Sequence, residues 1–350
     1  MPSAGFITTD FATQVDPPLP NGCAWYRMVL PSRQLAALGW DTGVGMPRVH
    51  PDKGFGVAHE DGAFFGWDVS VFKLIMHEST SAMFRKVQEN GHKVVVDIDD
   101  FHFGIHEENI AASKTNPNLN PENNRMFYEM GIRQADTVTV STQFLADFYS
   151  RRCRDVRIVR NALDVDRFTR IKQLEKPVFG WVGATMWRSG DIELLSEWLP
   201  EFSQDYGIQV HHSGHIPNDP RHFAVRAGLK RVTTSMMASI PDYPKLLTHF
   251  HVGLIPLTRN PFNEAKSSLK GLEYAAAGIP FIATPTEEYR LLNEAGVGRL
   301  ASTPDEWRDH AVALLNPEIR VAEAERNWEI VNREFNIATK GQEWASALLG

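Results

Sequence analysis

The stretch NPFNEAKSSLKGLEYAAAGIPFIAT, residues 260–284, decides the fold of this chain. Residues 251–257, two residues before it, form an apolar run that is typical of a buried parallel strand. Good helix formers occupy residues 269–277, and residues 281–283 are apolar enough for the next strand. A strand, a loop, a helix and a second strand in this order predict an α/β fold with parallel sheets.

The ends of the predicted helix carry typical boundary residues. Ser267 or Ser268 can cap its amino end. Gly278 suits the position just after a helix, and Pro280 forbids continuation. The free N–H groups and the dipole of this helix point at the preceding polar loop, so the sequence predicts an anion site there.

Three charged side chains are spaced to share one face of this helix. Lys266, Lys270 and Glu273 stand at positions i, i+4 and i+7. Two ammonium groups near a helix amino end oppose the dipole, and a bound diphosphate would reverse that penalty. Glu273 could then accept hydrogen bonds from the vicinal hydroxyls of a ribose. A surface helix with an ordinary Lys270–Glu273 pair also explains the spacing, so the spacing alone leaves both interpretations open.

The same residues resemble a motif of a known enzyme family. Residues 272–280, LEYAAAGIP, match the pattern L-E-x-x-A-x-G-x-P in the donor-binding helix of retaining GT-B glycosyltransferases, the large family-4 group. Residues 266–274, KSSLKGLEY, resemble a sub-branch with the pattern K-S-x-x-K-x-L-E-Y. The family often has another Glu eight positions before the helix Glu, where this chain has Ala265. That departure concerns the carboxylate that contacts the sugar.

The resemblance implies an α/β architecture of the GT-B type, with two Rossmann-like domains that face a cleft. We expect an acceptor domain at residues 1–170, a nucleotide-sugar donor domain at residues 175–329, and a final helix at about 330–350 that crosses back to the first domain. The implied activity is transfer of a sugar from a nucleotide-diphospho-sugar to an acceptor hydroxyl, with retention of configuration. It needs no metal and no cofactor beyond the nucleotide-sugar co-substrate.

A second part of the expected donor site follows the strand predicted at residues 178–182. In the family, this turn carries an Arg and a Lys toward the diphosphate, at places that Ala184 and Ser189 hold here. Arg188 lies next to the second place and is the natural substitute cation. The expected donor-binding residues are Gly183, Ala184, Thr185, Arg188, Lys266, Ser267, Ser268, Lys270 and Glu273.

A cluster of carboxylates follows the strand predicted at residues 93–97. Asp97, Asp99 and Asp100 would repel one another unless a metal ion, a basic neighbour or acceptor hydroxyls offset them. Ligands of open α/β sheets lie beyond the carboxyl ends of strands, so we expect this cluster to face the cleft. The expected catalytic residues are Arg188, Lys266 and Lys270 for charge on the leaving phosphate, with Asp99 and Asp100 on the acceptor side.

The loop after the first predicted strand, residues 10–22, faces the acceptor in the family. The expected acceptor-side residues are Asn21, Gly22, Arg27, His77 and His102. For Asn21, Gly22 and Arg27, a plain turn before a helix at residues 23–38 is the alternative interpretation. Residues 106–124 are polar and predict a long surface loop.

Composition narrows the class of protein. The chain has 350 residues, 43% hydrophobic and 23% charged, which is typical of a globular protein with enough length for two domains. It has no apolar run long enough to span a bilayer, no evident signal peptide and only two cysteines, so we expect a cytoplasmic protein. The net charge of −7 makes nucleic acid an unlikely partner, and its histidines and cysteines show no metal-site spacing.

Three alternatives to a glycosyltransferase remain open from the sequence. A sugar-nucleotide epimerase or hydrolase could use the same architecture. The missing Glu and Arg would also fit a nucleotide-sugar-binding protein whose catalytic site has drifted. A transferase that modifies DNA is disfavoured by the acidic balance. The acceptor could be a hydroxyl on a protein, a glycolipid or a polysaccharide.

Overall fold

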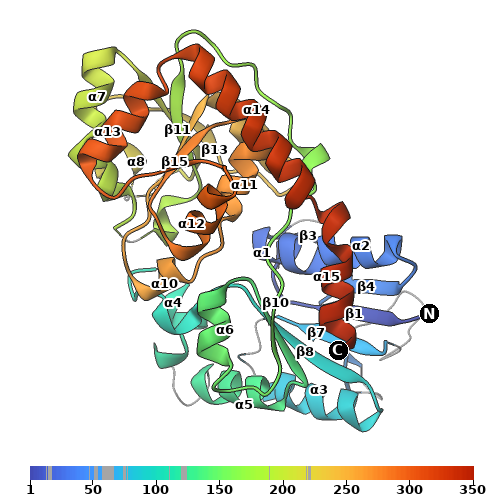
Figure 1. Cartoon of the computed structure of the whole chain (residues 1–350). Coiled ribbons are helices and arrows are strands. Elements are labelled where there is room, and N and C mark those ends of the chain that lie inside the picture. Colours follow the sequence, from blue (N-terminus) through green and yellow to red (C-terminus); the bar gives the residue numbers. More distant parts are fainter. Residues whose placement is uncertain are drawn as a thin grey trace.

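The computed structural model of the chain describes residues 1–12, 14, 18–46, 48–50, 54–56, 67–73, 76, 78–109, 111–119, 124–188, 190–217, 219 and 222–350. His77 and Ser189 lie outside these residues. Across the described chain, the backbone forms two six-stranded sheets, one in each half of the sequence (Figure 1). Every strand pair within these two sheets is parallel.

The first sheet has the strand order β10-β9-β8-β7-β1-β4. Its strands are β1 (Ser3–Ile7), β4 (Asp41–Gly45), β7 (Val69–Phe72), β8 (Lys93–Ile98), β9 (Thr137–Val140) and β10 (Val156–Ile158). The helices around it are α2 (Leu30–Ala37), α3 (Glu78–Glu89), α5 (Met126–Gln134) and α6 (Gln143–Tyr149). The strands β7 and β9 are buried along their whole length, as expected for a sheet that helices cover on both faces.

The second sheet has the order β13-β12-β11-β14-β15-β16, which is the Rossmann order. Its strands are β11 (Val178–Val182), β12 (Gln209–His215), β13 (Thr233–Met236), β14 (Val252–Ile255), β15 (Phe281–Ala283) and β16 (Arg299–Leu300). The helices of this half are α7 (Leu199–Tyr206), α8 (Phe223–Arg226), α9 (Tyr243–Leu246), α10 (Pro261–Glu264), α11 (Leu269–Ala276), α12 (Glu287–Glu294) and α13 (Pro304–Ala313). The strand order reverses between β11 and β14, and ligands of such sheets bind beyond the strand ends at that point.

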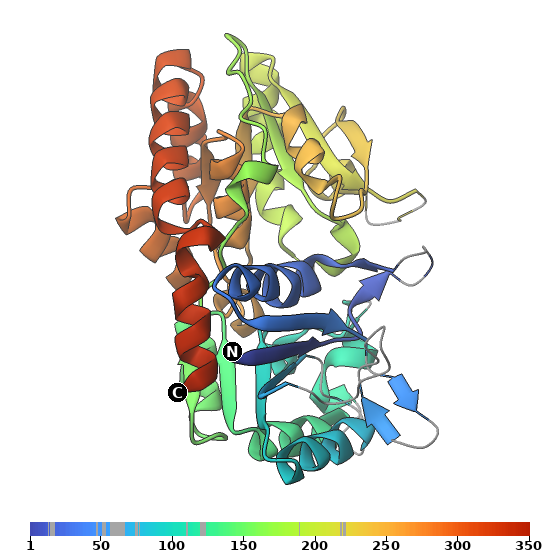
Figure 2. The same cartoon turned by 90° about the vertical axis from the view of Figure 1, so that its right-hand side faces the viewer.

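The carboxyl-terminal helices tie the two halves together. Helix α14 (Pro317–Glu334) packs on α11, and α15 (Ile337–Leu349) packs on α2 of the first half (Figure 2). The chain crosses at Leu163, whose N–H donates to Phe335 O at 2.8 Å and whose carbonyl accepts from Ile337 N at 2.6 Å. Trp344 of α15 then packs edge-on against Phe6 of β1, with ring centroids 6.2 Å apart. The predicted return of the last helix to the first domain is confirmed.

Two expectations need correction. Within the segment predicted as a long surface loop, the described residues 106–109 and 111–119 include the helix α4 (Ala112–Thr115) and bury Asn109 and Asn116. Asn116 donates from Nδ2 to Ile105 O at 2.7 Å, so a buried polar side chain helps to hold the segment. The helix predicted at residues 23–38 begins with α1 (Gly22–Ala24) and has a π-helical stretch, Trp25–Val29, before α2.

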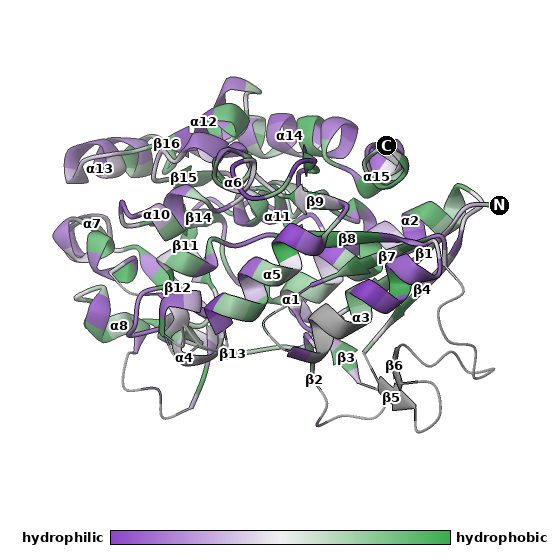
Figure 3. Ribbon diagram, turned by 90° about the horizontal axis from the view of Figure 1, so that it is seen from below, coloured by the Kyte–Doolittle hydropathy of each residue, from purple (hydrophilic) through white to green (hydrophobic). Residues whose placement is uncertain are grey.

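Hydropathy follows this architecture. In Figure 3, helix α14 alternates between hydrophilic and hydrophobic stretches, as a helix that covers a core on one side should. No helix in the described part of the chain is long and apolar enough to cross a membrane.

Candidate active site

Helix α11 begins at the carboxyl edge of the second sheet, and its sequence explains both of its ends. Ser268 holds the N-cap position, but its side chain makes no capping hydrogen bond, so the expected serine cap is absent. Ser267 instead accepts a hydrogen bond on Oγ from Asn161 Nδ2 at 2.8 Å. Gly278 follows the helix with φ of +70°, a conformation that favours glycine. The first N–H groups of the helix have no carbonyl partner within it, which leaves them available to an anion.

Lys270 lies at the switch point of the second sheet. Its Nζ donates to the carbonyl oxygen of Val182, the last residue of β11, and lies 5.2 Å from the ring centre of Trp181. Gly183 follows with φ of +140°, and a Cβ placed there would lie 3.5 Å from Lys270 Nζ. A glycine at this turn therefore lets the backbone adopt its conformation and keeps space beside the ammonium group.

Lys270, Lys266 and Arg188 form a cation cluster. Burial lowers the pKa of Lys270 to about 7, and the charges of Arg188 and Lys266 contribute to that lowering, against the opposing charge of Glu273. Arg188 and Lys266 thus lie close enough to Lys270 to affect its charge, and a bound anion would relieve the repulsion among the three cations.

Arg188 is held beside a buried carboxylate. Its Nη1 lies 4.0 Å from Asp191 Oδ2, while Asp191 Oδ1 accepts from Thr258 N at 2.9 Å and from Asn263 Nδ2 at 2.7 Å. Asp191 therefore fixes the turn after β11 to the loop after β14. Thr185 donates its hydroxyl to Asp219, another buried carboxylate of the same region.

Glu273 is enclosed by two tyrosines that sequence reasoning did not select. Tyr26 donates to its Oε1 and Tyr243 to its Oε2, both at 2.6 Å. Burial raises the pKa of Glu273, although Lys270 and both hydroxyls oppose the rise. Each carboxylate oxygen thus already binds one hydroxyl, which is the kind of partner expected from a ribose. Tyr26 stands next to Arg27, which the sequence predicts on the acceptor side.

The carboxylates at the end of β8 each have their own cation. Asp97 accepts from Arg27 Nη2 at 2.6 Å and from Nε at 3.0 Å, with both residues buried. Asp99 pairs with Lys73: burial alone would raise the pKa of Asp99, but the Lys73 ammonium holds it well below its ordinary value. The structure therefore selects basic neighbours, among the three alternatives, as the groups that offset this cluster.

Asp100 receives its cation from the other half of the chain. Its Oδ1 lies 3.3 Å from Lys266 Nζ, in an ion pair whose side chains are 31% and 17% exposed. Lys266 also lies over the ring of Phe262, at 3.9 Å from its centre. A member of the cation cluster is therefore shared with the first sheet.

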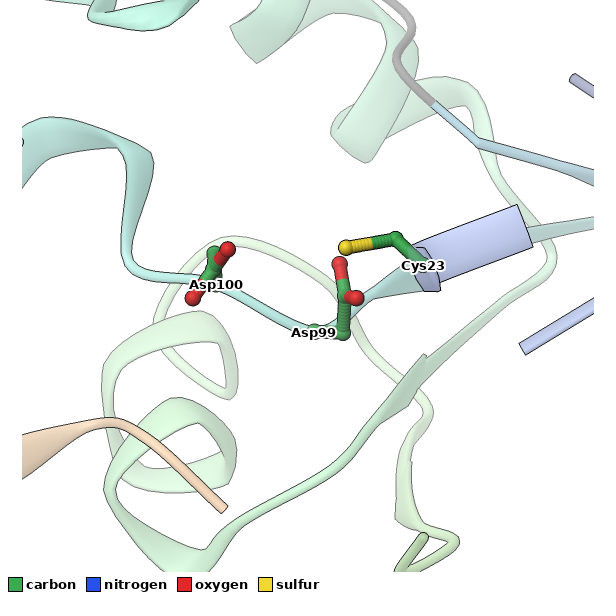
Figure 4. Close-up of side chains that lie close together, drawn as sticks. All are labelled: Cys23, Asp99 and Asp100. Carbon is green, nitrogen blue, oxygen red and sulfur yellow. The ribbon is translucent and has the colours of Figure 1, made fainter. Parts of the chain in front are cut away.

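One group of potential metal ligands occurs among the described residues. Cys23, Asp99 and Asp100 offer ligand atoms within 4.8 Å of one another (Figure 4). Lys73 already contacts Asp99, and Lys266 contacts Asp100. Two ammonium groups thus already supply positive charge to these carboxylates.

The loop between α10 and α11 contacts three neighbouring strand ends of the first sheet. Thr142, after β9, donates to Ala265 O at 3.1 Å. Lys266 contacts Asp100 after β8, and Ser267 contacts Asn161 after β10. We call residues 265–267 the clasp. The Ala265 side chain is completely buried in the core of the first half, so a Glu at this position would be buried among apolar groups.

The expected acceptor-side residues are spread over the first half. Asn21 donates from Nδ2 to Asp10 Oδ1 at 3.1 Å, and Gly22 lies near Ile240. His102 contacts Tyr128 through Nδ1 at 3.1 Å, and burial lowers its pKa to about 4, so it is neutral at pH 7. His77 cannot be placed because it lies outside the described residues.

Arg27 is 1% exposed and fully engaged. Besides Asp97, its guanidinium donates to Val159 O at 2.6 Å and to Asn161 Oδ1 at 3.1 Å, and it lies 4.8 Å from the ring centre of Trp344. These partners join β8, the residues after β10 and α15. Arg27 thus contacts Asn161, which in turn contacts Ser267 of the clasp.

Comparison with known proteins supports the architecture. Residues 176–317 match the family model described as "Glycosyl transferases group 1". No curated protein sequence matches the chain significantly. This family match spans α11, β11 and β14, and therefore most of the residues described above on the second sheet.

Solved structures match the whole chain. HepE of Anabaena, in complex with UDP and glucose, superposes with a TM-score of 0.65 and 14% identity over 99% of both chains. An α-glucosyltransferase in complex with UDP gives 0.64 and 12% over 99% of this chain and 100% of that one. TarM of S. aureus gives 0.59 and 13% over 87% and 63%. Two parallel Rossmann-like sheets, a terminal helix that returns to the first of them and these superpositions together show that the chain has the GT-B fold.

Proposed function

We propose that this protein is a glycosyltransferase that transfers a sugar from a UDP-sugar to an acceptor hydroxyl, with retention of configuration. The observation that carries the proposal is the cation cluster at the switch point of a Rossmann-ordered sheet, beside the free N–H groups of α11. The match of residues 176–317 to group 1 glycosyl transferases and the UDP complexes of structural relatives support the same reading.

The donor diphosphate would lie between the β11 turn and the amino end of α11. Lys270 and Arg188 would contact it from two sides, and Lys266 would exchange Asp100 for phosphate. Negative charge grows on the β-phosphate as the glycosidic bond breaks, so these fixed cations would stabilise the transition state more than the ground state. Glu273 would hold the ribose hydroxyls in the way that it now holds Tyr26 and Tyr243.

The acceptor would enter from the first sheet. Asp99 and Asp100 lie at the carboxyl end of β8, across from the clasp, where they can accept hydrogen bonds from an acceptor hydroxyl. The departing phosphate can take the acceptor proton, so the scheme needs no protein nucleophile and no metal. We also propose the domain division at residues 1–170 and 175–329, with about residues 330–350 joining the first domain.

A thermal-shift screen tests the proposal first. We expect UDP and UDP-sugars to raise the melting temperature more than GDP, ADP or TDP counterparts, because a ligand that binds only the native state stabilises it. Lys270→Ala should abolish the shift, while Lys230→Ala, which removes an exposed lysine of the same half, should retain it. Equal responses in the two variants would contradict the site.

Product analysis separates the remaining alternatives. Incubation of a UDP-sugar with an acceptor panel should give a glycoside with the donor's anomeric configuration by NMR. Breakdown or epimerisation of the donor without acceptor as the only reaction would instead indicate a hydrolase or epimerase. Tight nucleotide binding with no turnover would indicate a binding protein.

A further inference from the structure

A hollow of about 470 Å³ lies on the first half, between α5 and the end of α6. This arginine pocket is lined by Arg125, Arg133, Arg151, Arg152, Glu129 and Phe148. Its volume is within the range of pockets that hold small molecules. None of these residues belongs to the donor or acceptor groups described above.

The charges in the arginine pocket are unbalanced. Arg125 Nε lies 3.1 Å and Arg133 Nη2 3.7 Å from the Glu129 carboxylate, so two guanidinium groups share one carboxylate. Both arginines are largely exposed, at 53% and 70%. Arg151 and Arg152 add two more positive charges, in a chain whose net charge is −7.

Part of the pocket is held in a fixed arrangement. Arg152 donates from Nη1 to Phe148 O at 2.9 Å, and its guanidinium carbon lies 3.8 Å from the centre of the Phe148 ring. A guanidinium group that is stacked on a ring keeps several N–H donors directed outward, in the forked geometry that matches carboxylate and phosphate oxygens. The pocket therefore presents an anion-binding wall as well as a positive charge.

Helix α6 connects this pocket to the clasp. Its amino end is capped by Thr142, which also donates to Ala265 O of the clasp, and its carboxyl end is followed by Arg151 and Arg152. Seven residues of α-helix separate the two ends, or about 10 Å at 1.5 Å per residue. The pocket and the clasp therefore lie at opposite ends of α6, about 10 Å apart along its axis.

We propose that the arginine pocket binds an acidic sugar unit, bearing a carboxylate or a phosphate, of a saccharide acceptor. This inference rests on the proposed function and specifies its acceptor class. The pocket would hold a charged unit distant from the reacting hydroxyl, so that binding energy from a remote part of the substrate orients the hydroxyl toward the donor.

The shape of the site favours a saccharide over a membrane or a nucleic acid. Its charges line a hollow, whereas a membrane-binding helix presents a broad apolar face with charges around it. Among the described residues of α5 and α6, Met126 is the one large apolar residue that is exposed. A nucleic acid would bind to a row of basic side chains on the protein that follows the phosphate backbone. The net negative charge of this protein opposes such binding.

Binding of oligogalacturonate, measured by calorimetry without any donor, tests the pocket. Its methyl ester is the matched neutral ligand, and a phosphorylated oligosaccharide provides the phosphate arm. We expect at least one acidic ligand to bind and the neutral one not to bind. Arg125→Gln with Arg133→Gln should weaken the binding at least about tenfold, because two charge-assisted contacts are lost. Arg154→Gln, an exposed arginine outside the pocket, should leave it unchanged.

Glu129→Gln is the opposing variant. It frees two guanidinium groups from their shared carboxylate, so the acidic ligand should bind a few-fold more tightly. Equal binding of acidic and neutral ligands, or no effect of the double arginine variant, would overturn the proposal. Pocket-dependent binding of only inorganic phosphate, only anionic vesicles or only single-stranded DNA would also overturn it, in favour of that partner.

Donor turnover keeps this test separate from the proposed function. Hydrolysis of the UDP-sugar in the absence of acceptor should be the same in the wild type, in the double arginine variant and in Glu129→Gln. If the wild type transfers sugar to no member of the acceptor panel, the proposed function fails, but the calorimetric comparison still decides the pocket. If donor turnover is normal but the acidic ligand binds the double arginine variant as tightly as the wild type, only the inference about the acceptor fails.

Discussion

The carboxyl ends of the two sheets carry opposite kinds of charge, and the two regions balance that charge differently. On the first sheet, Asp97 and Asp99 are each neutralised by a dedicated cation, Arg27 or Lys73. On the second sheet, Lys270 has no carboxylate within ion-pair distance among the described residues and donates to a carbonyl. The two carboxylates of the first region thus have partners of opposite charge. Lys270 of the second region has no such partner, and a bound anionic ligand could supply one.

Lys266 stands between the two regions. It completes the first by pairing with Asp100, and it contributes to the lowered pKa of Lys270 in the second. Ion pairs that are satisfied internally therefore indicate structure, whereas cations crowded at a strand end indicate a ligand. The following predictions disturb one side of this contrast at a time.

The largest effect is expected from removing the cation of a buried ion pair on the first sheet. Arg27→Met leaves the Asp97 carboxylate buried without its cation, which should lower the free energy of unfolding by about 3–5 kcal/mol. Chemical denaturation measures this change. The double variant with Asp97→Asn should recover part of the loss, because no unpaired charge remains. A loss below about 1 kcal/mol for Arg27→Met would show that the pair is not essential to the first half.

Removal of a cation from the cluster at the second sheet should affect the transfer rate more than the stability. Lys270→Ala or Lys266→Ala should slow transfer at least roughly tenfold, or about 1.4 kcal/mol, through lost phosphate stabilisation. Steady-state assays with Lys230→Ala as the control measure this effect. Nearly unchanged turnover in correctly folded variants would contradict the role of the cluster.

The pH dependence of donor binding should show the lowered pKa of Lys270 directly. In the free protein Lys270 loses its proton near pH 7, whereas a bound diphosphate raises its pKa, so the complex holds more protons. Donor affinity should therefore fall as pH rises above about 7, by at most about tenfold per pH unit. Calorimetry at several pH values measures this slope. Lys270→Arg, which stays charged, should remove it, and an identical slope in that variant would place the titrating group elsewhere.

Release of the shared cation should have a smaller and opposite effect. Asp100→Asn frees Lys266 for phosphate, so UDP should bind up to about fivefold more tightly, since partly exposed ion pairs contribute about 0.2–1 kcal/mol. Transfer should nevertheless fall, because Asp100 also serves the acceptor. Weaker UDP binding in this variant would mean that Asp100 and the donor do not compete for Lys266.

Metal removal should have no effect on activity. Lys73 and Lys266 supply the positive charge that the carboxylates need, so EDTA should leave the transfer rate unchanged. Loss of activity with rescue by a divalent ion would instead assign Cys23, Asp99 and Asp100 as ligands.

Sequence reasoning located the inner strands of both sheets but missed three edge strands, β4, β13 and β16, for physical reasons. The residues of α11, its glycine terminus and the flanking apolar strands are local signals, and each is confirmed. The strand β4 was missed because its residues, DTGVG, include a single large apolar side chain and two glycines. It forms because β1 offers a parallel edge for pairing, which is a tertiary effect.

The candidate site shows the same division. The spacing predicted one helix face for Lys266, Lys270 and Glu273, but α11 begins at Leu269, so Lys266 lies in the loop before the helix. Nothing local indicated that Tyr26, 247 residues away, would donate to Glu273. The partners of the acidic cluster also come from distant segments, so the sequence could only name the three kinds of group that might offset it. Pairings across the chain depend on topology, and they become visible only in the folded structure.

A crystal structure of the protein with UDP tests the central claim most directly. We predict the diphosphate at the amino end of α11, with Lys270 Nζ and an N–H group of the first turn in hydrogen-bond contact with its oxygens, and with Lys266 drawn away from Asp100. UDP bound at a distance from β11 and α11, with Lys266 still paired to Asp100, would contradict the account.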